Sequence, residues 1–358
     1  MTVYLIVFTV VSVCAILSCT QISAKIKDSM YWGCAGGLVL LSAIRDLSVG
    51  ADTLVYCEEF HTIRGLTFLE AMHFRWEQGY VAVNWLLGNI FQNERFFIIA
   101  MACIILIPIF VWIKRESEWP ILSLVVFVGM GMWNLSMTHL RQWCAVAILT
   151  FSYKYVKERK FIWFLVFLCI AALFHRTAIA FVLVYFVTII PINKRTLLAA
   201  VPLAAIEGIF GEEIMNLLNR FARIGEVGSY NGGIKMLIVL WGCVFIAYVF
   251  FEGKIPKKMQ LWFRMVFLAA FLQPIVFTFS NWSRVVAYFS VSLIIFFPDF
   301  IMEWTEERTS RLPSTVIVWN GKRIDKVKQR LLLGTVLCVL MFIWFCMTID
   351  APYAFMPF

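Results

Sequence analysis

The chain has 358 residues, of which 62% are apolar and only 15% are charged, and its mean hydropathy is +0.84. A soluble domain could carry this composition only by exposing large apolar patches, so the composition excludes a soluble enzyme and predicts a polytopic membrane protein. The net charge of +9 would suggest nucleic-acid binding in a soluble protein, but here Lys and Arg gather in short turns between apolar runs. The positive-inside rule explains that pattern, and no nucleic-acid partner is expected.

Apolar runs recur along the whole chain. A crossing helix needs roughly 20 apolar residues, or fewer beside a polar cavity, so we expect an all-α integral membrane protein with about 12 transmembrane helices. The first run lacks the basic start and the small-residue cleavage site of a signal peptide, and it is expected to remain as a helix. The expected spans are residues 2–22, 30–44, 96–113, 119–137, 142–156, 161–173, 177–191, 196–210, 234–252, 261–279, 284–302 and 331–349.

The basic turns orient these spans. They comprise residues 25–27, 114–115, 154–160, 194–195, 254–258 and the long basic loop 303–330. All of them lie in the cytoplasm only if residues 45–95 stay outside as an amphipathic or re-entrant segment. Residues 211–233 then form a second extracytoplasmic loop, and residues 1–358 form a single transmembrane domain.

Residues 45–56 directly follow the second expected span and hold Arg45, Asp52 and Tyr56. Arg45 and Tyr56 could serve as an interfacial anchor at headgroup level. The functional alternative makes Arg45 a phosphate ligand, and Asp52 a base or an acceptor for a sugar hydroxyl.

The sequence Trp76-Glu77-Gln78-Gly79-Tyr80 opens the next helix. A carboxylate in the first turn is favoured by the helix dipole, which alone could explain Glu77. Glu77 is also a candidate for acid–base catalysis.

Two motifs interrupt apolar runs with a His and an Arg. They are Thr138-His139-Leu140-Arg141-Gln142 and Phe174-His175-Arg176-Thr177. An ionisable residue at membrane depth is costly and often marks a functional site. The arginine fork suits bidentate phosphate contacts, whereas an ion pair with a carboxylate is the structural alternative. An imidazole can exchange a proton near neutral pH, although His175 could also simply bond a neighbouring carbonyl.

Further candidates lie nearer the carboxyl terminus. Arg284 starts another expected span in Asn281-Trp282-Ser283-Arg284, and Tyr230 lies in the 211–233 loop. Most aromatic residues are expected in lipid belts, but Tyr56, Trp76, Tyr80 and Tyr230 are candidates for stacking on sugar rings. The chain lacks a phosphate-binding glycine loop, a dinucleotide motif, a zinc helix and a nucleophile elbow, so no metal and no cofactor is expected.

The motifs around Arg45, Gly50-Ala51-Asp52-Thr53 and Tyr56, Glu77-Gln78-Gly79-Tyr80, Leu140-Arg141-Gln142 and Phe174-His175-Arg176-Thr177 together resemble the EpsG family. The resemblance covers roughly residues 1 to 300. It implies a GT-C-like helical bundle and a Wzy-like polymerase of exopolysaccharide, capsule or O-antigen. Such an enzyme lies in the bacterial cytoplasmic (inner) membrane, with its active site on the extracytoplasmic face. Its substrates are undecaprenyl-diphosphate-linked oligosaccharides, and a chain-length regulator and a flippase are candidate partners.

The resulting hypothesis is a metal-independent glycosyl transfer. Guanidinium groups would stabilise the leaving diphosphate, with Arg141, Arg176, Arg284 and Arg45 as candidates in that order. The acceptor hydroxyl would lose its proton to His175, with Asp52, His139 and Glu77 as alternatives. A polysaccharide ligase or a lipid-linked oligosaccharide flippase are the competing functions. Polar residues that cluster on one side favour an enzyme over a transporter.

Overall fold

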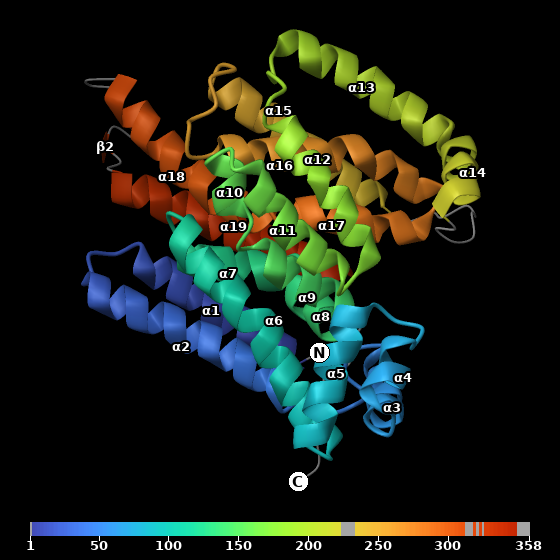
Figure 1. Ribbon diagram of the computed structural model, residues 1–358. Coiled ribbons are helices and arrows are strands. Elements are labelled where there is room, and N and C mark those ends of the chain that lie inside the picture. Colours follow the sequence, from blue (N-terminus) through green and yellow to red (C-terminus); the bar gives the residue numbers. More distant parts are fainter. Residues whose placement is uncertain (1, 223–232, 312–317, 320–321, 324–325, 349–358) are drawn as a thin grey trace. The chain divides into compact units, whose positions relative to one another are not determined.

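The computed structural model describes residues 2–222, 233–311, 318–319, 322–323 and 326–348 (Figure 1). Within these ranges nearly all regular structure is helical, which confirms the expected all-α class. Strands occur in the described part of the chain only as β1 (Val318–Trp319) and β2 (Lys322–Arg323), which pair antiparallel.

The chain divides into two compact units. Unit 1 comprises Met1–Tyr153, Cys169–Arg176 and Phe297–Phe358, and unit 2 comprises Lys154–Leu168 and Thr177–Phe296. The boundaries fall within four elements, α10 (Tyr153–Lys157), α11 (Phe161–Ala172), η1 (Arg176–Phe181) and α18 (Leu293–Arg311).

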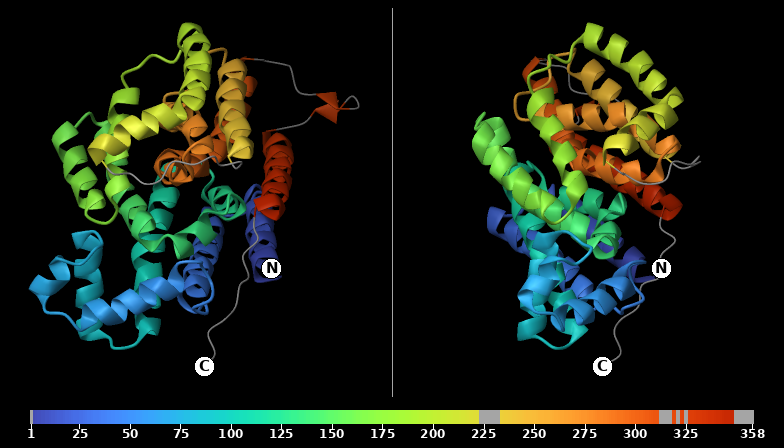
Figure 2. Two further views of the ribbon diagram at one scale, coloured as in Figure 1. Left: turned by 90° about the vertical axis from the view of Figure 1, so that its right-hand side faces the viewer. Right: turned by 45° about the vertical axis from the view of Figure 1, so that its right-hand side comes forward.

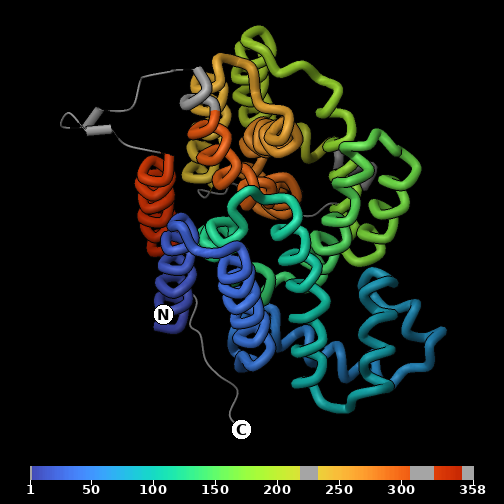
Figure 3. The backbone as a smooth tube through the Cα atoms, turned by 90° about the vertical axis from the view of Figure 1, so that its left-hand side faces the viewer, coloured from blue at the N-terminus to red at the C-terminus, as the bar shows by residue number. Residues whose placement is uncertain are grey.

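The body of unit 1 is a bundle of long apolar helices. Helix α1 (Thr2–Ser18) packs against α2 (Ala24–Ala43), α7 (Pro120–Gly129) and α19 (Lys326–Thr348), and α2 packs against α6 (Glu94–Glu116). Figures 2 and 3 show α19, in red, alongside α1, in dark blue. Ser23 caps α2 by accepting a hydrogen bond from the Ile26 backbone N–H at 3.3 Å, which fixes where this helix begins after the short turn from α1.

Residues 45–95 fold into three helices within unit 1. Helices α3 (Thr53–Arg64) and α4 (Phe68–Met72) both pack against α5 (Gln78–Ile90) around the buried residues Ile63, Ala71 and Val81. Thr67 and Glu70 form a capping box, in which each side chain bonds the backbone N–H of the other and so fixes the start of α4.

The expected span 119–137 is a broken helix. Helix α7 ends at Gly129, Gly131 adopts a left-handed φ of 73°, and α8 (Met132–Thr138) continues at an angle of 62° to α7. His139 then separates α8 from α9 (Leu140–Leu149). These two interruptions set the start of the helix that carries Arg141.

Unit 2 is organised around α16 (Gln260–Leu272). This helix packs against α12 (Val182–Val187), α13 (Lys194–Ile209), α15 (Ile234–Phe250) and α17 (Ser283–Ser290). Helices α14 (Gly211–Ala222), η2 (Gln273–Phe277) and η3 (Ser280–Trp282) complete the unit. In the 211–233 segment, expected as a loop, the described part is thus mostly the helix α14, and residues 223–232 lie outside the described residues.

The helices fit a membrane protein. A helix lies in each of the expected spans, and in the described residues three are long and apolar enough to cross a bilayer, Glu94–Glu116, Gln260–Phe277 and Lys326–Thr348. The number becomes five if each of two bent pairs counts as one span. Exposed apolar residues also form a stripe along α1, made of Ile6, Val10, Val13 and Leu17, as expected for a face against lipid.

Candidate active site

Three of the sequence motifs meet within unit 1 at the carboxylate of Glu77. Glu77 is the residue before α5, and its Oε2 accepts a hydrogen bond from Arg141 Nη1 at 2.6 Å. Its Oε1 accepts a bond from the Arg176 backbone N–H at 3.2 Å and lies 3.5 Å from His175 Nδ1. One carboxylate thus joins the start of α5, the start of α9 and the 175–176 turn.

The charge of Glu77 is stabilised by these neighbours. Burial raises the pKa of the Glu77 carboxyl, but the neighbouring His175 ring and the positive charge of Arg141 outweigh burial and lower this pKa to about 2. Glu77 is therefore ionised at any pH at which a cell lives, and so weak a base is poorly suited to abstract a proton itself. It is well placed to orient the two side chains beside it.

His175 has one ring nitrogen at Glu77 and one left over. The residue is 7% exposed, and neither ring nitrogen has a hydrogen-bond partner among the described residues, although Nδ1 lies within ion-pair distance of Glu77 Oε1, at 3.5 Å. A buried polar atom normally has a partner, and an unpartnered one at a cluster of charges points to a function. An imidazole can accept a proton when a carboxylate lies beside one ring nitrogen and the other nitrogen has no hydrogen-bond partner.

Gly79 allows this cluster to form. The backbone N–H groups of Gly79 and Tyr80 both donate to the carbonyl of Leu173, at 2.8 and 3.3 Å. A Cβ at residue 79 would lie 2.9 Å from both the Cβ and the carbonyl oxygen of Leu173. Only glycine permits this approach, which brings the first turn of α5 against the chain that leads into His175.

Aromatic rings border the cluster. The ring centre of Trp76 lies 5.4 Å from that of Tyr56 and 5.5 Å from that of Tyr80. The Arg141 guanidinium carbon lies 5.0 Å from the Trp76 ring centre, a cation–π distance. Glu77 and Trp76 therefore hold Arg141 from two directions.

The 45–52 segment packs against the end of α8. Arg45 is 1% exposed and donates to the carbonyls of Ser42 at 2.8 Å and Met137 at 3.3 Å. Gly50 has a φ of 91°, and a Cβ there would lie 2.9 Å from the Met137 carbonyl oxygen. These contacts place the loop beside the residues that precede Arg141.

The other predicted residues are placed less centrally. Asp52 is half-buried at the start of α3 and forms no side-chain cap, and His139 is half-buried between α8 and α9. The Arg176 side chain is exposed. Arg284 is half-buried in unit 2, and Tyr230 lies outside the described residues. The structure thus brings together Glu77, Arg141, His175, Tyr56, Trp76 and Tyr80.

The sequence analysis did not select Gly79 or Asn84 as site residues. Asn84 is fully buried, and its Nδ2 donates to the Tyr80 carbonyl at 2.8 Å, one helical turn back. Its position on the same face of the helix as Glu77 was a usable signal. The close approach of Gly79 depends on a contact with Leu173 that local sequence does not reveal.

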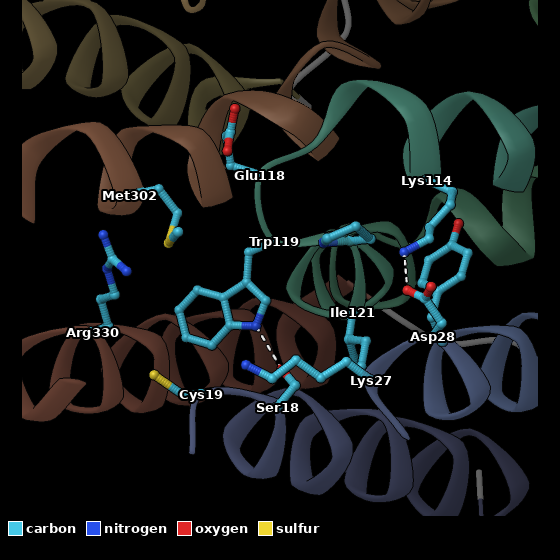
Figure 4. Close-up of a pocket in the computed structure, with 12 residues that line it drawn as sticks. Ser18, Cys19, Lys27, Asp28, Lys114, Glu118, Trp119, Ile121, Met302 and Arg330 are labelled. Carbon is cyan, nitrogen blue, oxygen red and sulfur yellow. Dashed lines mark hydrogen bonds and ion pairs between the residues drawn. The ribbon is translucent and has the colours of Figure 1, made fainter. Parts of the chain in front are cut away.

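A separate cavity of about 140 Å³ in unit 1 contains none of the predicted residues. Figure 4 shows its polar lining, in which Lys114 is paired with Asp28, and Trp119 donates to the Ser18 hydroxyl at 2.7 Å. This cavity lies at the carboxyl-terminal ends of α1 and α6 and at the start of α2. The cluster of Glu77, Arg141 and His175 adjoins the segment that follows the carboxyl-terminal end of α2. Among the described residues, no group of three His, Cys, Asp or Glu side chains could hold a metal ion.

Comparison with known proteins identifies the family. Residues 31–358, which make up nearly the whole chain, match the model of the EpsG family. No curated protein and no solved structure matches it. The family comprises membrane proteins of the polysaccharide-polymerase type, that is, polymerising glycosyltransferases. The chain therefore belongs to the EpsG family.

Proposed function

We propose that this protein joins undecaprenyl-diphosphate-linked oligosaccharide repeat units into a surface polysaccharide. In the proposed topology about 12 helices cross the bacterial inner membrane as a single GT-C-like transmembrane domain, and the Glu77 cluster faces the extracytoplasmic side. The lipid tail keeps the substrate in the bilayer, and the diphosphate is already an activated leaving group. The reaction then needs no nucleotide on that side.

The proposed reaction is one displacement at an anomeric carbon. A hydroxyl oxygen of the acceptor glycan forms a bond to the anomeric carbon of the donor, the bond from that carbon to the diphosphate oxygen breaks, and undecaprenyl diphosphate leaves. The hydroxyl proton passes to Nε2 of His175. Glu77 is a positioning residue, because its carboxylate orients the imidazole through Nδ1.

Arg141 is the proposed stabiliser of the leaving diphosphate. Negative charge grows on the diphosphate as the bond breaks, and a guanidinium that is already in place lowers the barrier. Glu77 accepts a hydrogen bond from Nη1 of Arg141. The Nε of Arg141 is buried and has no hydrogen-bond partner among the described residues. Tyr56 also forms a side-chain hydrogen bond with Arg141, and the donors that neither Glu77 nor Tyr56 engages are suited to phosphate oxygens.

The other predicted diphosphate ligands and bases are less central to the proposed reaction. The exposed side chain of Arg176 adjoins the cluster and is the second candidate diphosphate ligand. Arg284 in unit 2 stays a prediction. Arg45 already donates to two carbonyls, which gives it a structural task. Asp52 and His139 stay predicted alternatives for the base.

The aromatic residues beside Arg141 are proposed to bind sugars. Tyr56, Trp76 and Tyr80 form contiguous ring contacts directly beside Glu77. Trp76 is half-buried and offers the exposed ring surface that could pack against the C–H face of a sugar, whereas Tyr56 and Tyr80 are buried behind it and stay predicted sugar ligands. A chain-length regulator and a flippase of the same pathway are the proposed protein partners.

The observation that carries the proposal is the convergence of Arg141, His175 and the Arg176 backbone on the Glu77 carboxylate, although Arg176 is 99 residues from Glu77 in sequence. The test compares the sizes of surface and lipid-linked glycan in strains that carry wild-type protein, no protein, His175→Ala or His61→Gln. His61 is an exposed histidine paired with Glu94 and serves as the control.

We expect the deletion and His175→Ala to leave single repeat units, and His61→Gln to give full polymer. Full-length polymer stranded on its lipid carrier in the deletion strain would indicate a ligase instead. Single units trapped on the cytoplasmic side would indicate a flippase. Either result would overturn the proposal.

A further inference from the structure

A cavity of about 410 Å³ in unit 2 concentrates positive charge. Five basic residues line it, Lys157, Arg159, Lys257, Lys258 and Arg264. Among the residues that the structure describes, no Asp or Glu lines this cavity. The cavity in unit 1 differs, because Asp28 and Glu118 line it together with its basic residues. A concave site of one charge sign attracts an ion of the opposite sign.

Two arginines in the unit 2 cavity converge on one residue. Arg159 donates from Nη1 to the hydroxyl of Thr188 at 2.6 Å and from Nη2 to its carbonyl at 2.9 Å. Arg264 donates from Nη1 to the same carbonyl. Two guanidinium groups on one oxygen repel each other, and an anion between or beside them would relieve that repulsion.

The backbone at Arg159 also favours a role for its side chain. Arg159 follows α10 with a left-handed φ of 58°, and the bonds from the Lys160 N–H to the Tyr155 carbonyl and from the Arg159 N–H to the Val156 carbonyl form a Schellman motif. Glycine is the favoured residue at this position, because a side chain there is strained. An arginine instead keeps its guanidinium over the Tyr185 ring, 5.8 Å from the ring centre, and at the cavity.

A second cavity, whose wall is partly apolar, adjoins the basic one. It has a volume of about 530 Å³, and both cavities are lined by Lys257, Gln260 and Arg264. The rest of its wall consists of Gly253, Lys254 and five apolar residues, Pro191, Ile192, Ile255, Pro256 and Phe263. A basic cavity that adjoins a partly apolar one matches a ligand with an anionic head and an apolar body.

We propose that these adjoining cavities bind an anionic phospholipid, with its phosphate at Arg159 and Arg264 and its apolar part against Phe263 and Pro256. The site lies where α12 ends and α16 begins, next to the turns 154–160 and 254–258. The charge pattern assigns those turns to the cytoplasmic side, and basic pockets between transmembrane helices on that side suit lipid head groups. The proposal is independent of the Glu77 cluster.

The test measures the phosphatidylglycerol that remains bound to the full-length protein after purification in mild detergent, by mass spectrometry. The variants are Arg159→Gly and Arg264→Gln, with Lys160→Gln as the matched control. Arg159→Gly removes the guanidinium while placing the favoured residue at a left-handed position, so this variant is expected to fold. Lys160 is exposed, lies in the same turn and pairs with Glu158 at 2.8 Å outside the cavity.

We expect wild type and Lys160→Gln to retain equal amounts of lipid. Each arginine variant should bind phosphatidylglycerol about tenfold more weakly, the change expected when one charge-assisted hydrogen bond is lost. Equal retention by wild type and Arg159→Gly would overturn the proposal. A second arm compares thermal stabilisation by phosphatidylglycerol vesicles with that by inorganic phosphate. Stabilisation by phosphate alone would identify a soluble anion as the ligand and would contradict the lipid assignment.

Discussion

Glu77 Oε2 and Arg141 Nη1 lie 2.6 Å apart, although 64 residues separate them in sequence. The side chains of Glu77 and Arg141 are 9% and 22% exposed, respectively. Each therefore depends on the other to offset the cost of removing a charge from water. This ion pair links the motif at residues 76–80 to the motif at residues 138–142, which are far apart in sequence.

Replacing Glu77 by Gln should destabilise the protein by about 2 kcal/mol, because the Arg141 charge loses its counter-ion while staying largely buried. Thermal unfolding of purified protein in detergent measures this loss. In a double-mutant cycle, Arg141→Gln should cost little more once Glu77 is already Gln. Additive losses from the two substitutions would show that the pair is not coupled in the folded protein.

The same pair predicts an acid-dependent stability. The folded pKa of Glu77 is lowered from the ordinary value of 4.5 to about 2, so ionised Glu77 contributes stability that is fully present above the ordinary value. That contribution falls as the pH drops from about 4.5 towards 2. The difference in melting temperature between wild type and Glu77→Gln should be constant near neutral pH and shrink below pH 4.5. A difference that changes between pH 6 and 8 would contradict this assignment.

Gly79→Ala should disturb the candidate site without replacing any of its charged residues. The added methyl group would lie 2.9 Å from Leu173 Cβ and the Leu173 carbonyl oxygen, so the first turn of α5 must shift. We expect a stability loss of about 1–3 kcal/mol and a reduced polymer length. Gly36→Ala is the matched control, because a Cβ at Gly36 meets no atom within 4 Å. If both variants behave like wild type, the close approach to Leu173 does not matter for the site.

Arg45→Met should lower the amount of folded protein more than it lowers activity. The substitution leaves the Ser42 and Met137 carbonyls without their donor, at an expected cost of about 3 kcal/mol. The protein level in membranes and the polymer formed per folded molecule separate the two effects. A normal protein level in membranes with reduced polymer per folded molecule would instead support Arg45 as a ligand of the diphosphate.

The sequence predicts the helices well, because apolar run length and basic turns are local signals. A helix lies in each expected span. The same signals do not reveal the 62° break between α7 and α8, which follows from the left-handed backbone at Gly131. They also do not show how many of the shorter helices cross the bilayer.

The residues of the candidate site are recognisable from the sequence one at a time, as polar groups in apolar surroundings. Their connection is not, because it depends on long-range contacts. The Glu77 carboxylate contacts Arg141 and the Arg176 backbone in a structure in which the adjacent Gly79 packs closely against Leu173. Arg45 is a different case, since its charge predicts a ligand, and the sequence does not reveal its buried hydrogen bonds with the Ser42 and Met137 carbonyls.

The most direct test of the account uses purified protein in lipid nanodiscs with an undecaprenyl-diphosphate-linked repeat unit as the only substrate. Wild type and His61→Gln should both convert single units into a ladder of longer chains and release undecaprenyl diphosphate. His175→Ala, at an equal amount of folded protein, should form no chains longer than one unit. Ladder formation by His175→Ala at the wild-type rate would contradict the proposal that Nε2 of His175 accepts the proton.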